Sequence, residues 1–286
     1  MKRANVLWRV IAAFVGVSIL QAPAGMLAAV FVPVRAPLPD DVARHFLGWM
    51  LLTNAVTIAA LSAVAVRTEW RGWRLGFSVA LIPLAVVVIN GIEGIVFLKN
   101  LPIEWPRIFL TSAIAAILSA PVWMLLFGSR RDNPPEHFHP LASKSPGERA
   151  WKLVTCDLTY LALYFAAGSI IFPYVKSFYA SQTLPSPATI VGLQLLVRGP
   201  LFILLCLLLT RMLGMPRLRG AFVVGILFTV LSGIAPLLMP NPYFPDSVRW
   251  VHFSEVVSEN FIFGAIVAWL WGQPKLAHSP ALAQAV

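Results

Sequence analysis

Apolar residues fill most of the chain in stretches of about twenty, separated by short polar segments. The stretches cover residues 7–33, 46–66, 75–98, 107–128, 153–178, 187–210, 219–240 and 249–272. Each is long enough for an α-helix to cross a hydrocarbon layer about 30 Å thick. None shows the alternation over about ten residues that is typical of membrane β-strands. The pattern therefore predicts an all-α integral membrane protein with about eight transmembrane helices.

The first apolar stretch also resembles a secretory signal. MKRAN precedes it, and Ala22-Pro23-Ala24 has the small residues of a cleavage site. The apolar run nevertheless continues to Val32, which is too long for a typical signal core. We therefore expect a retained first helix.

Composition supports the membrane assignment, because 58% of the residues are hydrophobic, 12% are charged and the mean hydropathy is +0.78. The net charge of +10 raises the question of nucleic-acid binding. With a cytoplasmic N-terminus, however, fifteen of the 22 Lys and Arg residues lie on the cytoplasmic side, six lie outside, and Arg198 lies within a span. This positive-inside bias places both termini in the cytoplasm. We expect a multi-pass cytoplasmic (inner or plasma) membrane protein whose partners include lipids and exclude nucleic acid.

The single transmembrane domain, residues 1–286, divides near its centre at a polar, Pro-rich cytoplasmic linker over 129–150. Superposing the halves 1–128 and 151–286 with an offset of 143 residues, widening to 144, keeps the apolar stretches in step. The matched residues are Trp8 with Trp151, Leu51 with Leu195, Arg67 with Arg211 and Gly76 with Gly220. Four helices in each half return the chain to the same side, so the pattern predicts two parallel four-helix repeats.

The segments QAPAG at 21–25 and FAAGS at 165–169 occupy equivalent positions in the two halves. Paired interruptions of membrane helices often mark a central site. Small residues in membrane helices also let neighbouring backbones approach closely, and we favour this second interpretation.

The last apolar stretch contains polar residues where lipid disfavours them. His252, Glu255 and Glu259 are spaced by three and four residues, so they share one helix face, and Asn260 adjoins them. At 1.5 Å per residue, Glu255 lies about 9 Å below the outer boundary and Glu259 lies near the midplane.

Polar residues at overlapping depths occur in three other stretches. Because a charge at the bilayer centre costs at least about 2.5–3.5 kcal/mol, these side chains should turn inward and line one shared site. The candidate residues for a substrate or proton site are Asn54, Asn90, Glu93, Gln194, Arg198, His252, Glu255, Glu259 and Asn260.

The charges of this set do not balance, because Glu93, Glu255 and Glu259 face a single arginine, Arg198. Excess acid must be neutralised by protons, a cation, a cationic ligand or water. We expect Glu255 or Glu93 to pair with Arg198, and Glu259 to be protonated or to face a cavity. Tyr160 and Tyr164 could extend such a cavity inward.

Each of these three carboxylates occurs in only one of the two halves. Under the repeat alignment, Thr111 and Ala115 stand where Glu255 and Glu259 stand, and Leu237 stands where Glu93 stands. A structural role common to both halves would not require them, which favours a specialised site. The alternative is a salt bridge that only locks helices together.

Three classes of function remain open. The first is a membrane carrier or binding protein with a polar site open toward the outer side and linked to protons or cations. The second is an intramembrane enzyme that acts on a lipid or isoprenoid through Glu and His residues. The third is an assembly or scaffold component. No GxSxG, HExxH, P-loop or dinucleotide motif occurs in a suitable context, so we expect no cofactor and no metal, and an enzyme is the less favoured class.

Overall fold

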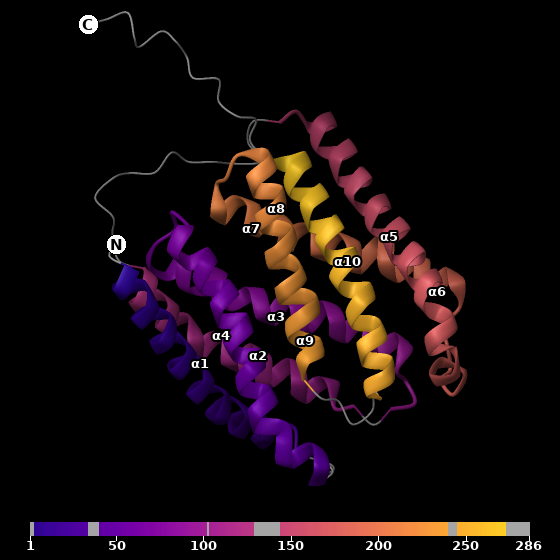
Figure 1. Ribbon diagram of the computed structural model, residues 1–286, viewed down its shortest axis with the longest axis horizontal. Coiled ribbons are helices and arrows are strands. Elements are labelled where there is room, and N and C mark those ends of the chain that lie inside the picture. The colour runs from indigo at the N-terminus through magenta and orange to yellow at the C-terminus, as the bar shows by residue number, and fades with distance from the viewer. Residues whose placement is uncertain (1–2, 34–39, 102, 129–143, 240–244, 273–286) are drawn as a thin grey trace, which may run out of the picture.

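The computed structural model describes residues 3–33, 40–101, 103–128, 144–239 and 245–272 (Figure 1). Every element of regular secondary structure within these ranges is a helix. Eight helices are long and apolar enough to span a membrane. The prediction of an all-α multispanning membrane protein is confirmed. Most of the predicted cytoplasmic linker lies outside the described residues.

The first five spans are single α-helices, the sixth and seventh are each made of several helical elements, and the eighth is the single helix α10. The elements are α1 (Arg3–Phe31), α2 (Asp40–Arg67), α3 (Gly72–Phe97), α4 (Trp105–Phe127), α5 (Pro146–Ala180), α6 (Pro187–Leu193), η1 (Gln194–Arg198), α7 (Gly199–Leu213), α8 (Arg217–Thr229), η2 (Val230–Ile234), α9 (Ala235–Leu238) and α10 (Asp246–Trp271). The sixth span comprises α6, η1 and α7, and the seventh comprises α8, η2 and α9. Both η elements are single π-helical turns.

The two halves of the chain pair their helices in the same way. In the first half α4 packs along α1 and α3, and in the second half α10 packs along α5 and α8 (Figure 1). The halves meet where α2 and α3 contact α7, η2 and α9. This shared pairing is what a duplicated bundle would produce, and the duplication itself stays a prediction.

Glycines allow the closest helix approaches. Gly91 and Gly94 on α3 lie against the rings of Phe109 and Trp105 on α4, where a Cβ atom would overlap the aromatic carbons. On α10, a Cβ atom at Gly264 would lie 3.2 Å from the Cα atom of Gly225 on α8. Small residues at such contacts let membrane helices pack through backbone atoms.

The exterior is apolar and the interior is filled by large side chains, as a bundle in lipid requires. Leu7, Ile11, Met26 and Val30 on α1 are exposed, with relative exposures from 52% to 74%. The fully buried rings are those of Trp123, Trp271, Tyr160, Phe228 and Phe263. The two cysteines, Cys156 and Cys206, are buried and free.

The helices are interrupted at other places than QAPAG and FAAGS. α1 runs through Pro23, and α5 runs through 165–169, without a break. The π-helical turns precede Pro200 and Pro236 in the sixth and seventh spans. Proline lacks an N–H and its ring crowds the preceding turn, so a wider turn relieves the clash.

Candidate functional site

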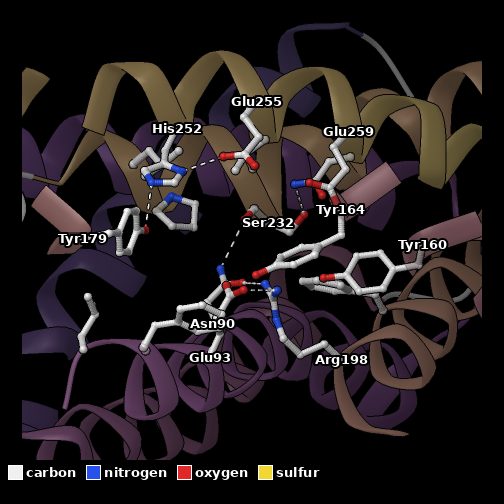
Figure 2. A pocket seen from close by; sticks show the side chains of 18 of the residues that line it. Asn90, Glu93, Tyr160, Tyr164, Tyr179, Arg198, Ser232, His252, Glu255 and Glu259 are labelled. Atoms are coloured by element: carbon white, nitrogen blue, oxygen red, sulfur yellow. Dashed lines mark hydrogen bonds and ion pairs between the residues drawn. The ribbon is translucent and has the colours of Figure 1, made fainter. Parts of the chain in front are cut away.

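A cavity of about 320 Å³ lies where α3, α5, the sixth and seventh spans and α10 meet. His252, Glu255 and Glu259 project into it from α10 (Figure 2). Asn90 and Glu93 on α3 and Arg198 at the end of η1 lie opposite them (Figure 2). Three of the four predicted polar helices therefore converge on one chamber, which we call the acidic cavity.

Arg198 forms the centre of the wall opposite α10. Its Nη1 atom lies 2.6 Å from Glu93 Oε1 and 3.2 Å from Gln194 Oε1, and its Nη2 atom donates to Asn90 Oδ1 at 3.4 Å. Gln194 Nε2 also donates to Glu93 Oε1 at 3.4 Å. Arg198 is only 6% exposed. The prediction that Glu93 or Glu255 pairs with Arg198 is confirmed for Glu93.

The second π-helical turn supplies a backbone acceptor to the same wall. Pro236 has no N–H for the carbonyl of Ser232, four residues earlier, and Asn90 Nδ2 donates to that carbonyl at 3.3 Å. Asn260 Nδ2 donates to Ser232 Oγ at 3.0 Å. Ser232 thus connects α3, the seventh span and α10 through hydrogen bonds, which fixes the side of the cavity that faces the first half.

His252 and Glu255 form a second polar group on α10. His252 Nδ1 lies 2.6 Å from Glu255 Oε2, and His252 Nε2 lies 3.0 Å from the hydroxyl of Tyr179 on α5. Because the ring has a carboxylate on one nitrogen and a phenol on the other, its orientation is fixed at both ends. Tyr179, His252 and Glu255 therefore form one hydrogen-bonded chain along the cavity.

Glu259 has different surroundings. Its side chain lines the acidic cavity and the residue is 7% exposed. No other residue within the described ranges forms a hydrogen bond or an ion pair with it. Of the two expectations for Glu259, that it is protonated or that it faces a cavity, the second is confirmed, and its protonation stays a prediction.

Aromatic side chains form much of the remaining wall. The cavity is lined by Phe97, Trp105, Tyr160, Tyr164, Tyr179 and Phe202. The guanidinium carbon of Arg198 lies 5.2 Å from the ring centroid of Phe202 and 5.9 Å from that of Tyr160. The tyrosines that were expected to extend the cavity, Tyr160 and Tyr164, do line it.

Asn54 does not belong to this site, so the expectation of one shared site for all four helices is wrong for α2. Its Nδ2 atom donates to Gln21 Oε1 at 3.0 Å, and Gln21 Nε2 donates back to Asn54 Oδ1 at 2.9 Å. These two residues line a second cavity of about 290 Å³ among α1, α2, α3, α4 and the seventh span. The amide of α2 is satisfied by an amide on its neighbour α1, which is why it need not reach Arg198.

Sequence reasoning missed several residues of the acidic cavity. Tyr179 lies near the end of α5 and Trp105 begins α4, so both look like ordinary interface aromatics. Ser232 carries a detectable signal, since a proline four residues later leaves its carbonyl without the usual helical partner.

No group of three His, Cys, Asp or Glu side chains in the described part of the chain is placed to bind a metal ion. No protein-family model matches this chain, no curated protein matches its sequence, and no solved structure matches its fold. Fold and site together define a helical multispanning membrane protein with an acid-rich cavity inside the bundle.

Proposed function

We propose that this protein is a membrane carrier or binding protein that takes a small organic cation into the acidic cavity and exchanges it with a proton at Glu259. The observation that supports this most directly is the position of Glu259. It is a carboxylate near the middle of a span, it lines a cavity, and no described residue pairs with it.

The charges of the acidic cavity favour a positive ligand. Glu93 already offsets Arg198, and Glu255 is bonded to His252. Whether His252 is neutral or protonated, the three carboxylates outnumber the positive side chains. A carboxylate inside a bundle is tolerated when a proton, a cation or water compensates it. A cation and a proton that compete for Glu259 would couple the movement of one to the other.

The aromatic wall favours an organic cation over an inorganic ion. An ammonium group within about 6 Å of an aromatic ring is attracted by the ring face, and cages of several rings recognise alkylated ammonium groups. Six aromatic residues line the cavity, and Arg198 shows that a cation can be held against Phe202 and Tyr160. Inorganic cations prefer oxygen ligands at fixed geometry, which fewer of these side chains supply.

The cavity lies toward one end of the bundle. Phe97 and Leu98 at the end of α3, Tyr179 near the end of α5 and His252 near the start of α10 all line it. In the orientation that the positive-inside bias predicts, these helix ends face the outer side of the membrane. The proposed site is therefore loaded from outside.

Binding of tetraethylammonium to the purified protein tests the proposal. We expect saturable binding by calorimetry, loss of most affinity in Glu259→Gln, and no binding of the uncharged isostere 3,3-diethylpentane. Glu69→Gln is the matched control, because Glu69 is exposed in the connection between α2 and α3. Uptake of radiolabelled tetraethylammonium into proteoliposomes separates a carrier from a binding protein. Equal affinity in Glu259→Gln would contradict the proposal.

The chain of Tyr179, His252 and Glu255 supports a second candidate function, an intramembrane enzyme that uses a His and Glu acid–base pair on a lipid. The two functions differ for His252→Ala. An enzyme would lose turnover of its lipid substrate, whereas a cation-binding protein would keep tetraethylammonium binding because Glu259 is intact.

A further inference from the structure

We propose that the second cavity, formed by α1, α2, α3, α4 and the seventh span, is a separate binding site for an uncharged amphiphile, a molecule with an apolar body and a single hydroxyl or carbonyl head. It has a volume of about 290 Å³, close to the 320 Å³ of the acidic cavity. We call it the neutral cavity. The inference does not depend on what the acidic cavity binds.

The two cavities use equivalent positions of the two halves. Seven residues that line the neutral cavity align, at the offsets of 143 and 144, with residues that line the acidic cavity. The pairs include Gln21 with Tyr164, Asn54 with Arg198 and Ala115 with Glu259. The neutral cavity therefore occupies the place in its half that the acidic cavity occupies in the other.

Both cavities are lined by the third helix of each half. α3 contributes Asn90 and Glu93 to the acidic cavity and Pro83 and Val86 to the neutral cavity, and the seventh span also contributes residues to both. This sharing places both cavities at the junction of the halves, where binding sites of duplicated membrane proteins are commonly formed. The neutral cavity thus has the architecture of a site and not of an accidental packing gap.

At equivalent positions, the neutral cavity has uncharged residues where the acidic cavity has charged ones. Where the acidic cavity has Arg198 and Glu259, the neutral cavity has Asn54 and Ala115. No Asp, Glu, Lys or Arg is among the residues that line the neutral cavity. An apolar chamber without charges does not compensate the desolvation of an ion, so its ligand must be uncharged.

The amide pair supplies the recognition of a polar head. Gln21 and Asn54 exchange hydrogen bonds of 2.9 and 3.0 Å, and Asn54 Nδ2 also donates to Ser18 Oγ at 3.3 Å. Each amide oxygen has a second lone pair that can accept a hydrogen bond. Gln21 also has a second N–H, in addition to the one that donates to Asn54. A hydroxyl both donates and accepts, so it complements this pair.

A further hydroxyl of the cavity lacks a partner. Thr53 lines the neutral cavity, and its Oγ1 atom is buried without a hydrogen bond to any residue in the described ranges. A buried polar atom that makes no hydrogen bond costs about 1–3 kcal/mol. An uncharged ligand with a hydroxyl or carbonyl could satisfy it, which is the second reason to place a polar head at this end of the cavity.

Photolabelling in lipid nanodiscs tests the inference with a decanol that carries a diazirine in its chain. Mass spectrometry then maps the modified residues. We expect labelling concentrated on the segments of α1, α2, α3, α4 and the seventh span that line the neutral cavity. In Ala115→Phe, which fills the cavity, it should fall at least about fivefold, the effect of losing about 1 kcal/mol of binding free energy. The matched control is Ala59→Phe, which adds the same ring at an exposed position of α2.

Two further probes keep the test independent of folding. The double variant Gln21→Leu with Asn54→Leu removes both amides together and keeps the apolar volume, so it should reduce labelling by the decanol probe and leave labelling by the corresponding decane unchanged. A decyltrimethylammonium probe should not label the neutral cavity. Labelling spread evenly over lipid-facing residues, unchanged by Ala115→Phe, would overturn the inference. Equal labelling by the charged probe would also overturn it.

Discussion

Arg198 is the charge on which the arrangement of the acidic cavity depends. It is buried at the end of a π-helical turn, is paired with Glu93 and lies near two aromatic rings. Its partners come from α3 and from its own span, so the guanidinium ties the two halves of the chain together. A buried pair of this kind contributes less net stability than its short distance suggests, because both charges lose water.

Removal of one partner of this pair should destabilise the folded protein more than removal of both partners. Arg198→Gln removes the positive partner of Glu93, whose side chain is 27% exposed, and should lower the free energy of unfolding by about 1–3 kcal/mol. Glu93→Gln with Arg198→Gln removes both charges and should recover much of that loss. Denaturant titration in mixed micelles measures the difference. Arg107→Gln is the control, because its pairing with Glu104 at 3.8 Å is partly exposed and is worth at most about 1 kcal/mol. A double variant as unstable as the single one would contradict this account.

Individual residues of the site were predictable where the free-energy cost of exposing a charge to lipid required the side chain to face the interior of the bundle. Glu93, Arg198, Glu255 and Glu259 could not face lipid, so convergence followed from their depth alone. Asn54 could not be placed in the same way. An amide is less costly to bury than a charge, and any neighbour with a second amide satisfies it. The sequence does not say which neighbouring helix α2 turns its amide toward.

At the scale of the elements, the π-helical turns place the polar groups. η1 ends at Arg198, and η2 contains Ser232, whose carbonyl accepts a hydrogen bond from Asn90 Nδ2. Pi-helical turns within α-helices occur often at functional sites. In both spans a proline, which cannot complete the regular helical ladder, follows the turn.

Pro236→Ala should restore a regular helix through the seventh span. The new N–H would compete for the Ser232 carbonyl, so Asn90 would lose its acceptor and the wall of the acidic cavity would shift. We expect the new amide at position 236 to be protected from hydrogen exchange and tetraethylammonium binding to be weaker, with the protein still folded. Pro173→Ala, at an exposed position inside α5, is the control and should leave binding unchanged. Unaltered binding in Pro236→Ala would show that the turn does not shape the site.

The close approach of α3 and α4 gives a stability prediction. Gly94→Ala places a methyl group in the Trp105 ring, and such overpacking costs about 1–3 kcal/mol. Gly25→Ala meets no atom within 4 Å, and alanine in a helix should stabilise by about 0.5–1 kcal/mol relative to glycine. Thermal unfolding in detergent should therefore move in opposite directions for the two variants. A stabilised Gly94→Ala would rule out this packing.

The number and bounds of the spans followed from hydropathy, since only long apolar helices satisfy their backbone in lipid. The helix interruptions did not follow. Pro23, Pro83, Pro121 and Pro173 stay within regular α-helices, whereas Pro200 and Pro236 follow π-helical turns. A proline by itself does not determine whether its helix kinks or forms a wider turn. The outcome depends on whether a neighbouring helix supplies a hydrogen-bond donor to the carbonyl that the proline leaves without a partner.

For the whole molecule, the proposed orientation determines what each cavity can reach. Cysteine labelling with a membrane-impermeant maleimide tests it. Asn100→Cys, in the α3–α4 connection, should react in intact cells, and Gly147→Cys, in the first turn of α5, should react only after permeabilisation. The native Cys156 and Cys206 are buried, so they should add little background. The reverse pattern would place the acidic cavity toward the cytoplasm.

The two halves pair their helices in the same way, and their cavities differ in chemistry. Alignment of the halves showed that each carboxylate occurs in one half only. The alignment does not show that α3 and the seventh span line both cavities, because it carries no information on which helices of different halves are neighbours. Contacts between distant spans decide that arrangement.

Under the proposed function, Glu259 holds a proton that a cationic ligand displaces. Proton release on addition of tetraethylammonium, followed with a pH indicator in weakly buffered detergent solution, tests it most directly. The native protein should release a proton when the cation binds, Glu69→Gln should do the same, and Glu259→Gln should release none. Cation binding by the native protein without proton release, or equal release from Glu259→Gln, would contradict it.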